Sequence, residues 1–225
     1  MPPPVLLVHG FASSYERNWR EPGWVDLLEE SGRDVIGVDL PGHGDAAKPH
    51  EPAAYTRMDL VVEQHLPDDP VDAIAFSLGA WLTLVVASRA PQRFSRIVVG
   101  GVGANLFRGE SPEALAVAVE TGDAPDGAPE AAGAFARFAR APGNDPAALA
   151  ACLRGAVERL EPASLAAVTC PVLVVLGDRD FAGPAEPLVA ALPDPTFVGV
   201  AGLDHFATPK DFRFVDAALR FLGCM

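Results

Sequence analysis

Short runs of apolar residues recur along the chain, and each is followed at once by small or polar residues. The runs are nearly continuous rather than alternating, which is typical of strands in a parallel sheet covered on both faces. The predicted strands are residues 5–8, 34–40, 71–76, 96–100, 171–176 and 196–200. Helical spacing between them predicts helices over 19–30 and 55–66, an apolar helix from Ala80 onward, and a last helix over 210–222. Strands separated by helices indicate a three-layer α/β/α architecture.

Residues 105–162 interrupt this rhythm. The segment is rich in Ala, Gly, Pro and Glu, has no β-rich run, and predicts helices over 112–120, 128–140 and 146–160. A structureless loop of this length is uncommon in a compact domain. We therefore expect an inserted helical lid at 105–162, with a disordered insert as the alternative, and a core formed by residues 1–104 and 163–225.

Charge and composition exclude several function classes. The 225 residues are 49% apolar and carry a formal net charge of −13, with no Lys/Arg run that would attract a phosphate backbone. This predicts no nucleic-acid partner. No apolar stretch reaches the length of a membrane span and no basic leader begins the chain, so the prediction is a soluble cytoplasmic protein. Cys152, Cys170 and Cys224 show no CxxC spacing, so neither a disulfide framework nor a zinc site is indicated.

The stretch VDAIAFSLGAWLTLVVA, which spans residues 71–87, carries the most informative serine. Ser77 lies at the turn between a predicted strand and a predicted helix, with Ala75 two residues before it and Gly79 two residues after it. Small residues at these positions let strand and helix approach closely while the serine projects outward, as in a nucleophile elbow. The alternative is that the Ser77 hydroxyl caps the helix N-terminus.

A nucleophilic serine needs a base and a carboxylate that orients the base. Asp178 and Asp180 follow the fifth predicted strand, and His205 follows the sixth. His9 and His43 also follow strands, but earlier ones. The chain order is therefore serine, acid, histidine.

Five motifs together resemble the α/β-hydrolase-fold serine hydrolases. They are VLLVHGF, VIGVDLPGHG, AFSLGA, LGDRD and GLDHF, in that order. The family's acid loop reads Gly-x-x-Asp, so the resemblance implies a triad of Ser77, Asp180 and His205 and leaves Asp178 as a turn residue bonded to its own backbone. Compared with the family, this chain lacks room for two initial strands. The expectation is six parallel strands, with 34–40 and 196–200 at the edges, and a possible homodimer through the first of these edges.

The same resemblance assigns roles around the triad. It implies an oxyanion hole formed by the backbone N–H groups of Phe11 and Leu78, and loop-holding roles for His9 and His43. Phe11 and Phe206 flank these loops and are the candidates for substrate contact. Six aromatic residues are expected near the rim, although Trp24 and Trp81 fit the core better: Phe11, Tyr15, Trp19, Trp24, Trp81 and Phe206.

These expectations favour a serine hydrolase that cleaves a small carboxylic ester through an acyl-enzyme, with a small-molecule acyl substrate. The same triad serves thioesterases, lactonases and carbon–carbon bond hydrolases or lyases, and the fold also serves non-catalytic ligand receptors. A serine at position 77 argues against haloalkane dehalogenases and epoxide hydrolases, which need a carboxylate nucleophile. No metal and no organic cofactor is implied.

Overall fold

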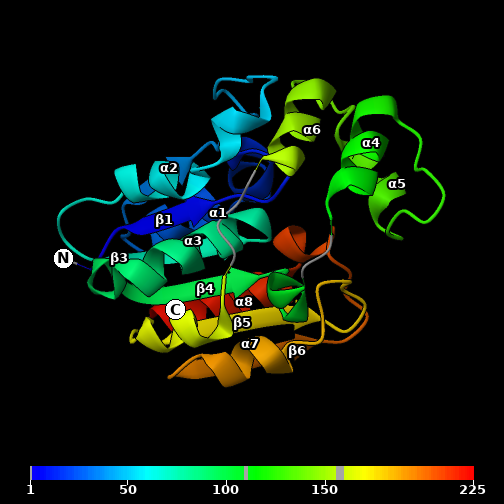
Figure 1. Cartoon of the computed structure of the whole chain (residues 1–225). Coiled ribbons are helices and arrows are strands. Elements are labelled where there is room, and N and C mark those ends of the chain that lie inside the picture. Colours follow the sequence, from blue (N-terminus) through cyan, green and yellow to red (C-terminus); the bar gives the residue numbers. More distant parts are fainter. Residues whose placement is uncertain (1, 109–110, 156–159) are drawn as a thin grey trace.

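The computed structural model describes residues 2–108, 111–155 and 160–225. Its centre is a six-stranded sheet in the order β2-β1-β3-β4-β5-β6, and every neighbouring pair of strands is parallel (Figure 1). The strands are β1 (Val5–Val8), β2 (Val35–Val38), β3 (Val71–Phe76), β4 (Phe94–Gly100), β5 (Val172–Gly177) and β6 (Pro195–Val200). The predicted architecture and both predicted edge strands are confirmed.

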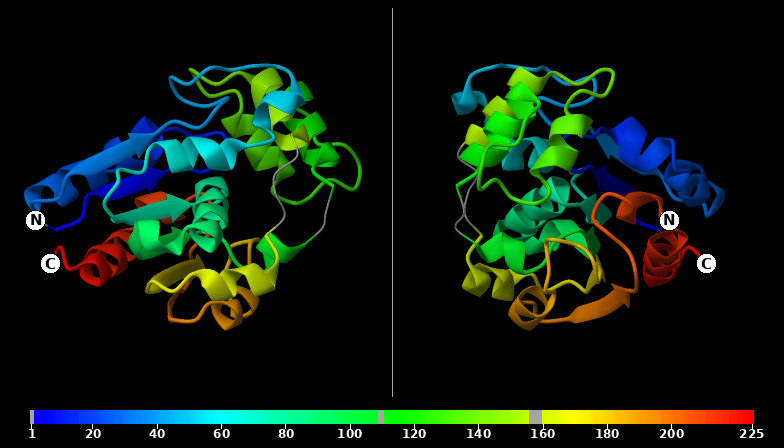
Figure 2. Two further views of the ribbon diagram at one scale, coloured as in Figure 1. Left: turned by 60° about the vertical axis from the view of Figure 1, so that its left-hand side comes forward. Right: turned by 90° about the vertical axis from the view of Figure 1, so that its right-hand side faces the viewer.

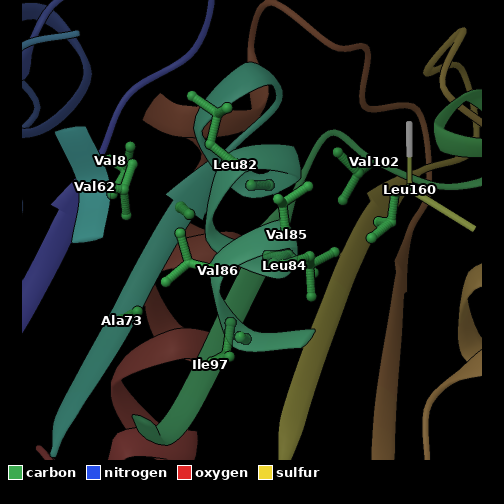
Figure 3. Close-up of a cluster of buried hydrophobic side chains, with 14 of the residues drawn as sticks. Val8, Val62, Ala73, Leu82, Leu84, Val85, Val86, Ile97, Val102 and Leu160 are labelled. Atoms are coloured by element: carbon green, nitrogen blue, oxygen red, sulfur yellow. The ribbon is translucent and has the colours of Figure 1, made fainter. Parts of the chain in front are cut away.

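Helices cover both faces of the sheet because side chains alternate along each strand. Leu6 and Val8 of β1 pack toward α2, α3 and α7, whereas Val5 and Leu7 pack toward α1 and α8. The α3 side of this core is shown in Figure 3. The helices of the two layers are α1 (Trp24–Glu30), α2 (Met58–Gln64), α3 (Leu78–Arg89), α7 (Glu186–Ala191) and α8 (Phe212–Leu222).

Several helices begin or end at other residues than predicted. The expected helix over 19–30 is split by Gly23, whose φ of 87° lies in the left-handed region, into a π-helix η1 (Glu16–Arg20) and α1. The expected helix over 55–66 breaks at Arg57, which is not helical. The remaining short helices are of the 3-10 type: η2 (Pro52–Tyr55), η3 (Pro91–Arg93), η4 (Ala104–Phe107), η5 (Pro162–Ala167) and η6 (Thr208–Lys210).

Three helices from the middle of the sequence form a separate group, which we call the α4–α6 segment: α4 (Glu113–Thr121), α5 (Ala132–Phe138) and α6 (Pro146–Arg154). Asp145 caps α6 by accepting hydrogen bonds from the N–H groups of Ala147 and Ala148. Helices α5 and α6 are shorter than the predicted 128–140 and 146–160, and residues 156–159 lie outside the described residues. The group lies to one side of the two helical layers, at the end toward which the strands point (Figures 1 and 2).

One face of the edge strand β2 is partly covered by Tyr15. The ring of Tyr15 lies so close to Gly37 of β2 that a Cβ atom there would come within 2.4 Å of it. A homodimer through this edge stays a prediction. In the described parts of the chain, no helix has the length and apolarity needed to cross a bilayer.

Candidate active site

Ser77 occupies a strained turn between β3 and α3. Its φ of 52° and ψ of −114° are rarely adopted by a residue with a side chain. The Ser77 side chain makes no capping hydrogen bond to α3, so the helix-cap alternative does not describe this structure. Two residues later, a Cβ atom on Gly79 would lie 2.4 Å from the carbonyl oxygen of Val8 and 2.5 Å from that of His9. Glycine is needed there because the helix start presses against the end of β1.

The structure brings three predicted residues from three strand ends into one hydrogen-bonded row. Ser77 Oγ lies 3.0 Å from His205 Nε2, and His205 Nδ1 lies 2.9 Å from Asp180 Oδ1 and 3.0 Å from Asp180 Oδ2. Asp180 Oδ1 also accepts a hydrogen bond from the N–H of Ala182. The side chains of His205 and Asp180 are buried, which shields their contact from water. Such a row can pass the serine proton to the imidazole.

Glycines let the loops that carry the acid and the histidine come together. A Cβ atom on Gly177, at the end of β5, would lie 2.0 Å from the carbonyl oxygen of Leu203 in the histidine loop. Gly101, with a φ of 67°, follows β4, and a Cβ atom there would meet the rings of Phe76 and His205. Glycine at these two positions therefore leaves room for the histidine loop and for the His205 ring.

The two other aspartates near these loops have different partners. Asp178 Oδ1 accepts a hydrogen bond from the N–H of Gly202, 2.7 Å away. The expectation that Asp178 bonds its own turn was wrong, because the parallel β5 and β6 end side by side and place the β6 loop nearer. Asp204 is exposed and accepts a hydrogen bond from the N–H of Ala207. Only Asp180, of these three carboxylates, meets His205.

The two residues expected to supply the oxyanion donors are near Ser77 in different ways: Phe11 lines the same pocket, and Leu78 follows Ser77 in the chain. Within the described residues, the backbone N–H groups of Phe11 and Leu78 donate no hydrogen bond. A Cβ atom on Gly10 would lie 3.3 Å from Ser77 Cβ, which shows how closely this loop approaches the serine. The Gly10 N–H donates to Asn18 Oδ1 at 2.8 Å. Asn18, which sequence reasoning missed, therefore holds the loop that follows β1 in place.

His9 and His43 are fully buried and tie loops together, with ring centroids 5.2 Å apart. The N–H of Leu40 donates to His9 Nε2, so His9 Nδ1 carries the proton and donates to the carbonyl of Gly10. His43 Nδ1 lies 2.9 Å from the carbonyl oxygen of Pro41. Burial lowers the pKa of His43 to about 3 and also lowers the pKa of His9. Both rings are therefore neutral at neutral pH.

A pocket of about 270 Å³ opens onto Ser77 and His205. Phe11 and Phe206 line it, where the sequence suggested substrate contacts. Trp19 is different: it was expected at the rim, but it is fully buried against Trp24 because η1 packs its inner face onto α1.

Sequence reasoning missed three further phenylalanines around the site. Phe135 and Phe138 of α5 line the pocket, and the Phe181 ring lies 4.3 Å from the His205 ring, centroid to centroid. The spacing of three residues between Phe135 and Phe138 places them on one helix face, which could have indicated a shared surface. Phe181 follows Asp180 directly, and nothing in the local pattern distinguishes it. Among the described residues, no cluster of His, Cys, Asp and Glu could hold a metal ion.

With this geometry in place, comparison with known proteins identifies the fold. Residues 3–108 match the family model described as the alpha/beta hydrolase fold. The chain has the α/β-hydrolase fold. The fold expected from the five motifs is thereby confirmed.

Individual members of the α/β-hydrolase fold family are similar over different parts of the chain. A pimeloyl-[acyl-carrier protein] methyl ester esterase from Neisseria meningitidis is 33% identical over 117 residues, which cover 50% of this chain and 42% of the esterase. A monoacylglycerol lipase from Mycolicibacterium smegmatis is 28% identical over 199 residues, covering 78% of this chain and 69% of the lipase. The structure of a thermophilic esterase from Thermogutta terrifontis, solved with malate bound, superposes with a TM-score of 0.72 at 22% identity, covering 99% of this chain and 90% of that one. The chain thus spans less than half of the methyl ester esterase.

Proposed function

We propose that the protein is a serine hydrolase that cleaves a small carboxylic ester through an acyl-enzyme. The observation that carries the proposal is the row from Ser77 through His205 to Asp180, at the pocket and on a strained elbow. Two family relatives are named as an esterase and a lipase, which agrees with this bond type. Thioesters, lactones and carbon–carbon bonds remain the alternatives on the same residues.

In the proposed mechanism, His205 Nε2 takes the proton of Ser77 as its oxygen attacks the ester carbonyl. The imidazolium then protonates the leaving alcohol, and water repeats the sequence on the acyl-enzyme. Asp180 holds the proton of His205 on Nδ1, so that Nε2 is free to act as the base. The Asp180 carboxylate also stabilises the transient imidazolium of His205.

The negative charge on the tetrahedral intermediate is proposed to be met by the N–H groups of Phe11 and Leu78. Leu78 begins α3, where the helix dipole favours an anion. A preorganised donor of this kind contributes about 3 to 4 kcal/mol in a well-studied protease. Because these donors belong to the backbone, the side chains at positions 11 and 78 are free to shape the site.

The pocket favours small apolar acyl or alcohol groups. Its volume of about 270 Å³ lies just below the range of about 300–1,000 Å³ that is usual for drug-sized ligands. Phe11, Phe135, Phe138 and Phe206 supply apolar walls. We propose that the α4–α6 segment, which contributes Phe135 and Phe138, serves as the lid expected from residues 105–162.

Replacing the nucleophile tests this function. Ser77→Ala is expected to lower kcat/KM for p-nitrophenyl acetate by at least about a thousandfold and to abolish labelling by a fluorophosphonate probe. Ser88→Ala is the matched control, because Ser88 lies on the same helix and its hydroxyl donates to the carbonyl of Val85. Circular dichroism checks that both variants fold. Full hydrolysis by Ser77→Ala would overturn the proposal, and a panel of esters, thioesters and lactones would rank the bond types.

A further inference from the structure

Ala12 follows the expected oxyanion donor Phe11 and has an unusual backbone. Its φ is 57°, and Ala12 and Ser77 are the non-glycine residues with positive φ in the described parts of the chain. The N–H of Ser13 donates to the carbonyl of Gly10 at 3.3 Å, so residues 10–13 form a turn with Ala12 in its third position. Glycine is preferred at a positive φ in that position. Alanine there costs about 1 kcal/mol or more, and it persists where its surroundings hold it.

The surroundings that hold Ala12 belong to the α4–α6 segment. The Ala12 side chain is 3% exposed and packs in a cluster with Ala116 and Val119 of α4, Phe135 of α5 and Leu149 of α6. The methyl group of Ala12 is thus buried among apolar side chains of the segment. Burial of one methyl group is a weak restraint by itself, so a directional contact is also needed to fix the turn.

Asn144, between α5 and α6, supplies that directional contact. Its side-chain Nδ2 donates to the carbonyl oxygen of Ala12 at 3.0 Å and to that of Phe138 at 2.9 Å. Its backbone N–H donates to the carbonyl of Ala141 at 3.1 Å, which closes the connection on itself. The neighbouring Pro142 accepts a hydrogen bond from the Arg17 guanidinium. The connection is therefore bonded to the β1 loop and to η1, and Ala12 and Arg17 of these two segments both line the pocket.

We propose that Asn144 is a positioning residue for the oxyanion hole and that seating of the α4–α6 segment completes that hole. This inference rests on the proposed function. Asn144 holds the carbonyl of Ala12, the strained turn keeps its shape, and the N–H of Phe11 stays directed at the reacting carbonyl. When the segment moves away, the turn loses both its hydrogen bond and its buried methyl group. Substrate access and transition-state stabilisation are then coupled through the side-chain amide of Asn144.

Asn144→Asp tests the proposal with a side chain of the same shape that lacks the donor. The variant is expected to lower kcat by about 10-fold to 100-fold with KM within twofold, because the Phe11 N–H that Asn144 positions acts in the transition state. The affinity for a trifluoromethyl ketone, which forms a tetrahedral adduct on Ser77, should fall by the same factor as kcat. Arg140→Gln is the matched control, because Arg140 bonds the carbonyls of Val119, Ala136 and Glu120 within the segment and does not touch Ala12.

A second pair of variants keeps the test decisive if Asn144→Asp folds poorly. Ala12→Gly removes the conformational strain, so Asn144→Ala in that background should lower kcat by less than a third of its factor in the parent chain. An equal loss in both backgrounds would overturn the inference. So would a higher KM with unchanged kcat, which would place Asn144 in binding alone. If hydrolysis depends on Ser77 and Asn144→Asp matches the parent, only this inference fails; if hydrolysis does not depend on Ser77, the proposed function itself fails.

Discussion

The sheet core and the α4–α6 segment are built from different side chains. The core buries large residues completely, among them Trp24, Leu6, Leu7 and Ile74. The segment is rich in buried alanines, with Phe135 and Leu149 as its large apolar residues in contact with Ala12. Full burial of a leucine contributes about 1.5–3 kcal/mol, whereas a methyl group contributes about 0.8 kcal/mol. The core therefore holds its geometry firmly, and the segment is held over the site by smaller contributions.

The core and the segment contribute different parts of the candidate site. The row of Ser77, His205 and Asp180 comes from strand ends of the core, where close contacts at Gly79 and Gly177 fix the loops. The segment supplies Phe135 and Phe138 to the pocket, and Asn144 between α5 and α6 bonds the carbonyl of Ala12. Under the proposed function, the core holds the reacting groups and benefits from rigidity, whereas the segment, as the proposed lid, must let substrate in and product out. Variants in the core should therefore change kcat, and variants of the pocket wall in the segment should change KM.

The largest effect is expected in the core, at Asp180. Asp180→Asn should lower kcat by roughly 10⁴-fold, because an amide favours the wrong tautomer of His205. Asp178→Asn is the matched control two residues away, and it should change kcat by less than about threefold because Asp178 bonds the backbone of Gly202. Steady-state kinetics with p-nitrophenyl acetate gives both values. Similar losses of kcat in the two variants would contradict the assignment of Asp180 as the acid that orients His205.

A second core prediction concerns stability rather than catalysis. His43 is buried with its pKa lowered to about 3, so between pH 6.5 and 3 the unfolded chain binds a proton at this position that the folded chain does not. The free energy of unfolding should therefore fall as the pH falls, by about 1.4 kcal/mol per pH unit for each such histidine. In His43→Gln this slope should be smaller. Urea unfolding at pH 7.5, 6 and 5 measures it, with His65→Gln at an exposed position as control. An unchanged slope in His43→Gln would contradict the burial argument.

The smallest effect is expected in the segment, at Phe138. This side chain is 44% exposed, lines the pocket and stacks on Phe206 at 5.1 Å. Phe138→Ala should raise KM for esters with apolar acyl groups by about 3-fold to 10-fold and leave kcat within twofold. The thermal midpoint should change little, because the ring is partly exposed. Phe212→Ala, at a 76% exposed position outside the pocket, controls for loss of a surface ring. A fall in kcat with unchanged KM would contradict the assignment of Phe138 to substrate binding.

The sequence by itself determined the sheet, its edge strands and the strand ends at which polar residues gather. The strands and the polar residues after them depend on a local pattern: a run of apolar residues, a serine between small residues, an aspartate or histidine after a strand. The two edge strands were expected from the resemblance to the α/β hydrolases. Parallel strands then bring their carboxyl ends to one edge of the sheet, whatever the loops contain. For this reason Ser77, His205 and the two aspartates Asp178 and Asp180 could be named before their distances were known, and the resemblance to the family's Gly-x-x-Asp loop selected Asp180.

Only the tertiary structure decided what surrounds those residues. Trp19 is in the core rather than at the rim, Asp178 bonds Gly202, and Asn144 reaches Ala12 across 132 positions of sequence. None of these contacts leaves a periodic or local signal, because each depends on which surfaces of distant elements meet. The strained φ of Ala12 also leaves no signal in the sequence, because alanine does not indicate a positive φ as glycine does. The local pattern of the chain thus determined at which strand ends the candidate site residues lie, and non-local packing decided which contacts hold them in place.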